Sequence, residues 1–485
     1  MAGTSGTTTC AAAVDIPLSA VDFDPATGAG SMSVIIGTPS GAALNVLVDT
    51  GSTGIVIPAS YLTSSTGTPL PGVTCLGPAQ ITYYPKGDTQ YGYYYLVKSM
   101  SLGLLSGSGS TATYACEIGP VVVFGIQCSS AQSQTTESGS TASSGTGSGT
   151  GVSMVPVSAG FGMFGVGFGR STNGYVNGYS ASPTQTGATG DTVYTLSNPF
   201  LHATSNSASL YPSYILSSKG NATSQGIVTA ANYEGELGVY TGYVTLGVTY
   251  ETFSSSSYGG TLAKLTAADP QPGVLNATTP TPASGSKCSC SCSETPVPTP
   301  GNWPPPPATI TFWETATGSI TLANKTATPP STTYTTGVLL DTGINTMIIN
   351  DSTGATMASN LAGYEVTVAI PGSTSAAIMS YTFTINAQTS STTTSAGTSS
   401  QYSVVALGTT NGDPTSPAQP ASVGVIQAAT TTTATTTTGS SGTGSSGTSG
   451  DTPQLFVNTG INVLNRYNYF FDASAGYIGF ALLPA

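Results

Sequence analysis

Basic residues are scarce in this chain. It has 8 Lys and Arg residues against 20 Asp and Glu residues in 485, and its formal net charge is -12. Few cations are therefore present to neutralise phosphate groups, which argues against nucleic acid and anionic membranes as partners. In acid, where carboxylates are protonated, self-repulsion would stay weak and few native carboxylate contacts would be lost. The composition favours an acidic, extracytoplasmic setting; the alternative is a low-complexity secreted surface protein with no special pH.

Histidine and long apolar runs are also nearly absent. His202 is the only histidine, and no Ser or Cys lies in a recognisable nucleophile motif, which argues against hydrolysis by a histidine-dependent triad. No run of 18 apolar residues occurs, so no membrane span is predicted. From the charge composition, we predict an extracellular or cell-surface protein.

The seven cysteines are an odd number, so at least one is free or pairs between chains. Cys116 and Cys128 bracket a Val-rich strand and could form a local disulfide. Cys288, Cys290 and Cys292 could bind a soft metal ion, but no His or fourth Cys nearby completes a tetrahedral site. Disulfides or free thiols in a surface loop are favoured there, and we predict neither a metal nor another cofactor.

The pattern of residues predicts an all-β chain with two lobes. Thr, Val, Tyr and Gly are abundant, charged helix formers are scarce, and short apolar runs alternate with turn residues. A chain of 485 residues also exceeds the size at which one core keeps growing. We predict an N-terminal lobe over 11–205 and a C-terminal lobe over 206–485. The second lobe would carry a Pro/Ser/Thr/Cys-rich insertion at 265–308 and a Thr/Ser/Gly-rich loop at 428–450.

Two segments of the chain resemble each other and carry the chemistry. LNVLVDTGSTGIVIPAS and GVLLDTGINTMIINDS each contain an apolar strand, the triplet D-T-G and a second apolar strand. Gly51 and Gly343 give the backbone the freedom for a sharp turn between the strands. Asp49 and Asp341 would then lie at strand ends and face each other across a central cleft.

Further landmarks appear in a fixed order around this repeat. They are SMSVIIGTP before the first D-T-G, GFGMFGVGFG and SLYPSYILSS between the two, and GINVLNRYNYFFDASAGYIGFA near the end. With the two D-T-G segments, these landmarks resemble the pepsin-like aspartic proteases, and the chain is similar to a divergent, bacterial-type member. The resemblance implies a bilobal fold with two six-stranded-type β-barrel lobes and a central cleft.

Paired carboxylates define the chemistry that the resemblance implies. Two such groups held close together cannot both ionise easily, so they share one proton. One acts as general base on a bound water, and the other polarises the scissile carbonyl. The sequence does not say whether Asp49 or Asp341 is the acid. The implied function is an aspartic endopeptidase that works in acid on an extended polypeptide.

Supporting residues follow from the same resemblance. Thr50 and Thr342 would hydrogen-bond across the lobes, and Ser52 would donate to the outer oxygen of Asp49. Ile344 stands where the family usually has a Ser or Thr that donates to the second aspartate, and the loss of that donor should raise the pKa of the pair.

The flap that would close over the substrate is predicted in the tyrosine-rich segment 81–97. Tyr83 is the candidate flap residue, with Tyr84 and Tyr91 as rivals, although tyrosines are also ordinary strand formers. The alternative function is a catalytically inactive pepsin-like protein that serves as an extracellular surface or assembly component. The Ser/Thr/Gly tracts and the odd cysteine count suit that alternative.

Overall fold

The structure is a computed structural model, and it describes part of the chain. The described residues are 12–21, 31–83, 88–107, 111–130, 154–156, 162–168, 178–179, 184–186, 192–194, 198–218, 229–231, 237–239, 242–268, 311–324, 331–351, 361–371, 376–385, 387–388, 407–408, 418–420, 422–427 and 455–483.

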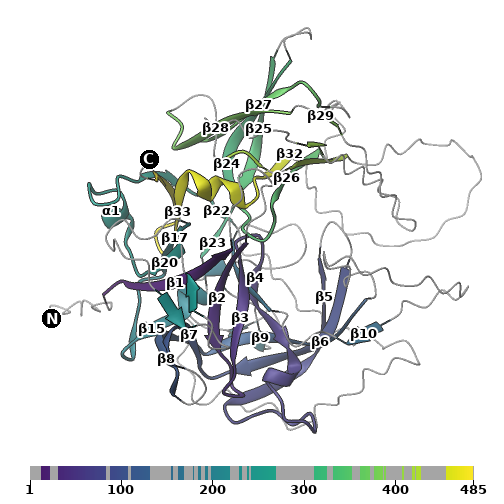
Figure 1. The fold of residues 1–485 in the computed structure, drawn as a ribbon, viewed down its shortest axis with the longest axis vertical. Helices are drawn as coiled ribbons and strands as arrows, with labels where there is room; N and C mark the ends of the chain where they lie inside the picture. The colour runs from purple at the N-terminus through teal and green to yellow at the C-terminus, as the bar shows by residue number, and fades with distance from the viewer. Residues whose placement is uncertain are drawn as a thin grey trace, which may run out of the picture.

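Strands dominate the described residues, and they form two lobes with a shared base (Figure 1). The sheet of the first lobe contains β2 (Ser31–Gly37), β3 (Ala43–Asp49), β4 (Thr53–Pro58), β5 (Val73–Tyr83), β6 (Asp88–Val97), β7 (Met100–Ser106), β8 (Thr113–Ile118), β9 (Val121–Ser130), β10 (Met154–Pro156), β11 (Met163–Val166), β15 (Ala203–Ser205) and β16 (Ala208–Ser209).

A base sheet links this lobe to the rest of the chain. Its strands are β1 (Val14–Val21), β17 (Ser213–Ser217), β20 (Gly242–Leu246), β21 (Thr261–Lys264), β33 (Tyr467–Asp472) and β34 (Tyr477–Leu482). β1 pairs with β20 through its first half and with β2 through its second half. The two sheets are therefore continuous and together contain 18 strands.

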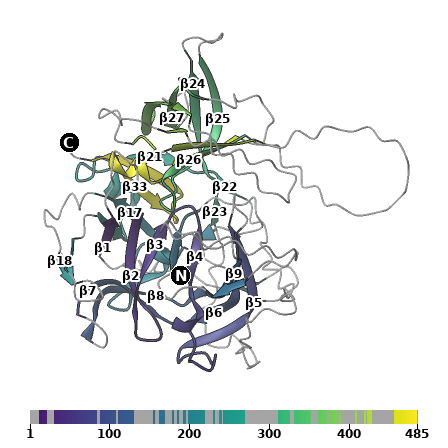
Figure 2. The same ribbon diagram turned by 45° about the vertical axis from the view of Figure 1, so that its right-hand side comes forward.

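The second lobe has a seven-stranded sheet in the order β28-β27-β24-β25-β32-β26-β31. Its strands are β24 (Ala316–Ala323), β25 (Ser331–Leu339), β26 (Thr346–Asp351), β27 (Glu365–Ile370), β28 (Met379–Thr384), β31 (Ser422–Gln427) and β32 (Leu455–Asn458). Along β28, buried and exposed residues alternate, so one face packs on the core and the other meets solvent. Figure 2 shows this sheet standing above the first lobe, with β33 between them.

Short elements complete the fold. The short strands are β12 (Gly178–Tyr179), β13 (Thr184–Thr186), β14 (Thr192–Tyr194), β18 (Thr229–Ala231), β19 (Leu237–Val239), β22 (Ala267–Ala268), β23 (Thr311–Trp313), β29 (Ala387–Gln388) and β30 (Leu407–Gly408). The helical turns are α1 (Tyr250–Phe253) and the 3-10 turns η1 (Ala59–Tyr61), η4 (Pro199–His202) and η5 (Ile461–Asn465). In the part of the chain that the structure describes, no helix is long and apolar enough to cross a membrane.

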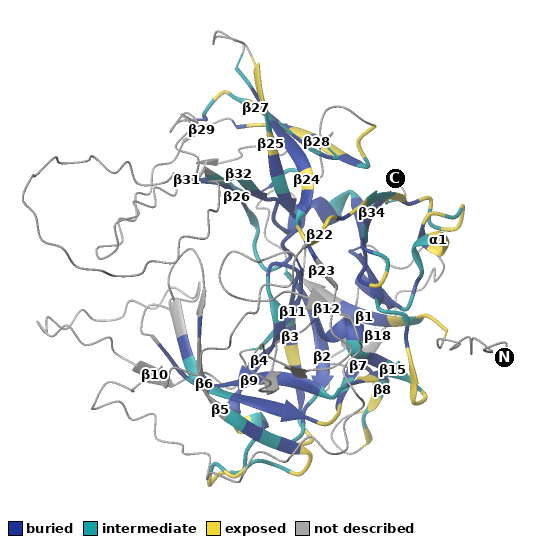
Figure 3. Ribbon diagram, turned by 180° about the vertical axis from the view of Figure 1, so that it is seen from behind, coloured by how far each residue is buried: buried dark blue, intermediate teal, exposed yellow. Residues whose placement is uncertain are grey.

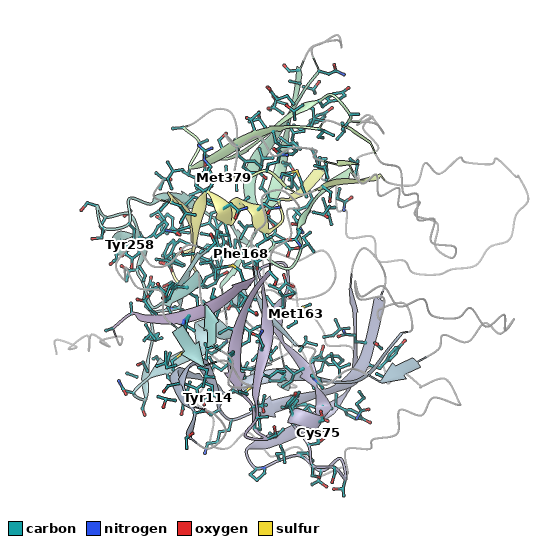
Figure 4. All side chains as sticks on the ribbon, in the orientation of Figure 1. Cys75, Tyr114, Met163, Phe168, Tyr258 and Met379 are labelled. Carbon is teal, nitrogen blue, oxygen red and sulfur yellow. The ribbon has the colours of Figure 1, made fainter. Side chains whose placement is uncertain are left out.

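One hydrophobic core runs through both lobes and the base sheet. Phe168, labelled near the centre of Figure 4, follows β11 and stacks on Phe471 of β33 with 4.2 Å between the ring centroids. All six residues of β33 are buried, which its aromatic sequence YNYFFD allows. Figure 3 shows this buried zone in dark blue along the strands that join the lobes. The core thus fixes how the two lobes sit against each other.

The all-β, two-lobed fold class predicted from the sequence is confirmed, and the arrangement is consistent with the pepsin-like fold. The lobe boundary between 11–205 and 206–485 stays a prediction. Most of the predicted insertion at 265–308 and all of the loop at 428–450 lie outside the described residues.

The possible disulfide between Cys116 and Cys128 does not form. Cys116 is a buried free thiol, whereas Cys128 is in a disulfide, as is Cys75. The reason is the strand pairing: β8 places Cys116 opposite Leu102 of β7, and β9 places Cys128 opposite Tyr91 of β6. The two cysteines follow each other closely in sequence but belong to different strand pairs.

The same four-strand unit occurs in each lobe. In the first lobe, β11 lies between β3, to which it is parallel, and β4, to which it is antiparallel, and β9 runs parallel on the other edge of β4. In the second lobe, β32, β25, β26 and β31 repeat these pairings with the same directions. The internal repeat seen in the sequence is therefore a repeat of strand topology.

Candidate active site

The two D-T-G triplets lie at equivalent points of the repeated units. β3 ends at Asp49, and β4 begins at Thr53 after the turn. β25 ends two residues before Asp341, and β26 begins at Thr346. Parallel pairing with β11 sets Gly165 opposite Asp49 and holds the end of β3 in place. Each aspartate thus lies where the chain turns between two strands that flank the same central strand, β11 in the first lobe and β32 in the second.

Thr50 and Thr342 join the two turns through a nearly symmetric set of hydrogen bonds. The backbone N–H of each threonine donates to the hydroxyl of the other, at 3.0 Å in both directions. The Thr50 hydroxyl in turn donates to the Leu340 carbonyl at 2.7 Å, and the Thr342 hydroxyl donates to the Val48 carbonyl at 2.6 Å. Both threonines are buried, so these four bonds form away from water and hold the triplets in fixed register.

Gly51 and Gly343 lie against the aspartate of the opposite lobe. The Gly51 N–H donates to Oδ1 of Asp49 at 2.7 Å, and the Gly343 N–H donates to Oδ1 of Asp341 at 2.9 Å. A Cβ atom on Gly51 would come within 2.2 Å of the Asp341 carboxylate, and one on Gly343 within 2.6 Å of the Asp49 carboxylate. Only glycine at these two positions leaves room for the two carboxyl groups to lie in contact.

Gly51→Ala is expected to separate the two aspartates, because the new methyl group would overlap the Asp341 carboxylate. Asp341 is buried and cannot swing into solvent, so the turn itself must move. Overpacking of this kind costs about 1–3 kcal/mol of folding free energy. Urea denaturation measures that loss. Gly41→Ala is a useful comparison, because its Cβ would meet nothing within 4 Å but its φ of +82° is strained. A stability loss at Gly51 no larger than that at Gly41 would contradict the close contact.

The outer oxygens of the two carboxylates have different donors. The Ser52 hydroxyl donates to Oδ2 of Asp49 at 2.5 Å. Ile344, which follows the second triplet, has no side-chain donor, and its carbonyl accepts the N–H of Ile461 at 2.9 Å. Oδ2 of Asp341 instead accepts a hydrogen bond of 2.5 Å from the side-chain amide of Asn458, at the end of β32.

Ile344 lacks the usual donor, as expected, but the amide of Asn458 takes the place of that donor on Asp341. Sequence reasoning missed Asn458, which is 117 positions away from its partner. In the sequence, Asn458 is visible only as a polar residue after the three apolar residues of the strand LFVN. A polar residue at such a place ordinarily marks the end of a strand, so it does not point to the site.

The electrostatics of the site favour a shared proton. Asp49 is 7% exposed and Asp341 5% exposed, and the two carboxyl groups are within hydrogen-bonding contact. Burial, followed by the charge of Asp341 and the hydrogen bond to it, raises the pKa of Asp49 from 3.8 to about 8. Hydrogen bonds from Ser52 and Gly51 oppose this shift without cancelling it. The arrangement can hold one proton between two oxygens and present one carboxylate as a base.

The predicted flap segment forms the β5–β6 hairpin. Tyr83 is the last residue of β5 and pairs with Asp88, the first residue of β6. Tyr84 lies outside the described residues, and Tyr91 is half-buried and opposite Gln80. A flap role for Tyr83 stays a prediction. Within the described ranges, no three His, Cys, Asp or Glu side chains cluster closely enough to hold a metal ion.

Comparisons with known proteins give a structural likeness alone. No protein-family model matches the chain, and no curated protein matches it in sequence. Among solved structures, the crystal structure of an aspartic proteinase from Irpex lacteus is similar over 97% of both chains, with 16% sequence identity and a TM-score of 0.40. A likeness at this level says nothing about activity, so the chemistry must be argued from the residues of this chain.

Proposed function

We propose that this chain is an aspartic endopeptidase that hydrolyses peptide bonds with water activated by Asp49 and Asp341. The observation that carries the proposal is the contact between these two buried carboxyl groups, each held by the N–H of a D-T-G glycine and by one side-chain donor. A pair of turn aspartates that only capped strands would have no reason to be buried against each other, since that burial costs free energy.

The chemistry follows from one shared proton. The ionised carboxylate accepts a proton from a bound water, whose oxygen attacks the scissile carbonyl carbon, and the protonated carboxyl gives its proton to the carbonyl oxygen. The tetrahedral diol collapses when the amide nitrogen takes the proton that the first carboxyl received from water, one diol hydroxyl gives its proton to the other carboxylate, and the C–N bond breaks. The four threonine hydrogen bonds would keep the two carboxyl groups in place through these steps.

The substrate in this proposal is a polypeptide bound in an extended conformation, as a strand beside the β5–β6 hairpin. We also propose an acidic extracellular or cell-surface setting, supported by the 8 Lys and Arg residues among 485. No cofactor takes part in the proposed reaction.

Cleavage of an acid-denatured protein substrate between pH 2 and pH 9, with and without pepstatin, tests the proposal. We expect pepstatin-sensitive cleavage in acid that persists toward neutral pH and disappears as the pH rises through about 8, because Asp49 then loses the shared proton. No cleavage at any pH by a folded wild-type protein would contradict the proposal. That result would favour the alternative of an inactive surface or assembly protein.

A further inference from the structure

Asn458 and Met163 occupy equivalent positions in the two lobes. β11 sets Met163 opposite Leu47 of β3, and β32 sets Asn458 opposite Leu339 of β25, with both pairs parallel. Each leucine lies two residues before the aspartate of its own D-T-G triplet. The match also holds on the neighbouring antiparallel strands, β4 and β26. There, Met163 and Asn458 each pair with the residue seven positions after the aspartate of the same lobe. The repeat therefore makes Asn458 the second-lobe counterpart of Met163.

At these equivalent positions, the hydrogen-bond donor and the apolar side chain are interchanged in the second lobe relative to the first. In the first lobe, Ser52 follows the triplet and donates to the aspartate, while the thioether of Met163, labelled in Figure 4, lies 3.3 Å from the Ser52 hydroxyl. In the second lobe, the apolar Ile344 follows the triplet, and Asn458 donates to the aspartate from the position of Met163. Each carboxylate keeps one donor on its outer oxygen, but one donor is a hydroxyl and the other an amide.

The orientation of the Asn458 amide is fixed by a second contact. Its Oδ1 accepts the backbone N–H of Gly460 at 3.1 Å. A backbone N–H can only donate, so the oxygen of the amide must face Gly460 and the amino group must face Asp341. Asn458 is 4% exposed, so little water competes for either contact. The donor on Asp341 therefore has a single orientation.

An amino group and a hydroxyl differ in whether they can accept a hydrogen bond from a protonated carboxyl group. The Ser52 hydroxyl can rotate to accept a hydrogen bond from a protonated Asp49, whereas the amino group of Asn458 has no lone pair to accept one from a protonated Asp341. We propose that Asn458 is a positioning residue that keeps Asp341 as the ionised member of the pair and leaves the shared proton on Asp49.

This inference assigns roles in the reaction, and its catalytic meaning rests on the proposed function. Water gives a proton to the Asp341 carboxylate while its oxygen bonds to the carbonyl carbon, and the carbonyl oxygen takes the proton of Asp49. The pair carries one negative charge before and after the step. Without the amide donor, the ionised form of Asp341 loses a hydrogen bond to its outer oxygen, so the pair should ionise at higher pH.

Asn458→Met, alone and combined with Ile344→Ser, tests the inference by giving the second lobe the residues of the first. We expect the acid limb of the pH profile of kcat/KM to move up by about one pH unit in the single variant, with about a tenfold loss at low pH. The double variant should move the limb part of the way back, because the new hydroxyl restores a donor but can also accept a hydrogen bond from the protonated carboxyl group. Asn465→Met is the control, since Asn465 contacts Asn462 and neither aspartate.

A purely structural role for Asn458 predicts a different outcome: lower stability with an unchanged pH profile, and no rescue by Ile344→Ser. That result would overturn the inference. If Asn458→Met does not fold, Asn458→Leu serves instead, because leucine has nearly the shape of asparagine and removes the donating amino group without adding a charge. The acid limb should move up in this variant too.

A measurement without turnover separates this inference from the proposed function. ¹³C NMR of aspartate-labelled protein, with the two carboxyl resonances assigned from Asp49→Asn and Asp341→Asn, follows each group in the wild type. We expect Asp341 to ionise at lower pH than Asp49. Asn458→Met should reduce the difference between these two pH values or reverse the order. Asp49 ionising first in the wild type would refute the inference even if the enzyme is active. The expected order in a protein that cleaves nothing would refute only the proposed function.

Discussion

Asp49→Asn is expected to abolish peptide cleavage while leaving the chain folded. Asparagine has the same shape as aspartate, but it can neither carry the shared proton nor act as a base. Groups that act as a catalytic unit lose about 10⁴-fold or more in turnover when one is removed. Asp341→Asn should have an effect of the same size, because the pair works through both carboxyl groups. Initial rates on a denatured protein substrate in acid measure the loss.

Asp15→Asn is the matched control for this experiment. Asp15 accepts a hydrogen bond from the Thr245 hydroxyl at 2.6 Å in the base sheet and takes no part in the D-T-G contacts. Its replacement should leave turnover close to that of the wild type. If Asp49→Asn kept more than about a tenth of the wild-type rate, Asp49 would not be a member of a catalytic pair.

The contribution of Asp49 to the free energy of unfolding is expected to fall as the pH rises from about 4 to about 8. Asp49 has an ordinary pKa of 3.8 and a pKa of about 8 in the folded chain. Between these values, the folded state holds a proton that the unfolded state has released, so a rise in pH favours unfolding. Below pH 4 both states are protonated and the stability is fully present. Within the window, this one group changes the free energy by at most about 1.4 kcal/mol per pH unit.

Urea denaturation at pH 4 to pH 8, on the wild type and Asp49→Asn, measures this effect. Burial also raises the pKa of Asp472, which adds a contribution of the same sign, and lowers the pKa of His202 to about 4, which adds one of the opposite sign, so the wild type alone mixes several contributions. The difference between the two proteins isolates Asp49. We expect the stability of Asp49→Asn to change less with pH and to exceed that of the wild type at pH 8. Parallel pH dependence in the two proteins would show that Asp49 is not buried as a proton-sharing group.

The fold class was predictable because its signals are local. Alternating apolar and polar residues, many β-branched residues and frequent turn residues predict strands wherever they occur, and the structure is built from them. The repeated strand–turn–strand segments around Asp49 and Asp341 also predicted that the two triplets would lie at equivalent strand ends. The hydrogen bonds between Thr50 and Thr342 were expected from the resemblance to the pepsin-like family, and the structure contains them.

The cysteines show where local reasoning fails. Cys116 and Cys128 are close in sequence and flank one apolar segment, which suggested a bridge. Strand pairing with β7 on one side and β6 on the other separates them, and Cys116 stays a free thiol. Proximity along the chain predicts contact only inside one hairpin, and this pair of strands is not one.

By itself, the sequence determined that two D-T-G turns exist, that each follows an apolar strand and that Ile344 leaves the second without a hydroxyl. Only the tertiary structure decided which group replaces that hydroxyl. Asn458 reaches Asp341 because parallel pairing of β32 with β25 carries it to the carboxylate across 117 positions of sequence. A hydrogen bond requires its two atoms to lie within about 3 Å, and long-range strand register sets such a distance where no local pattern can.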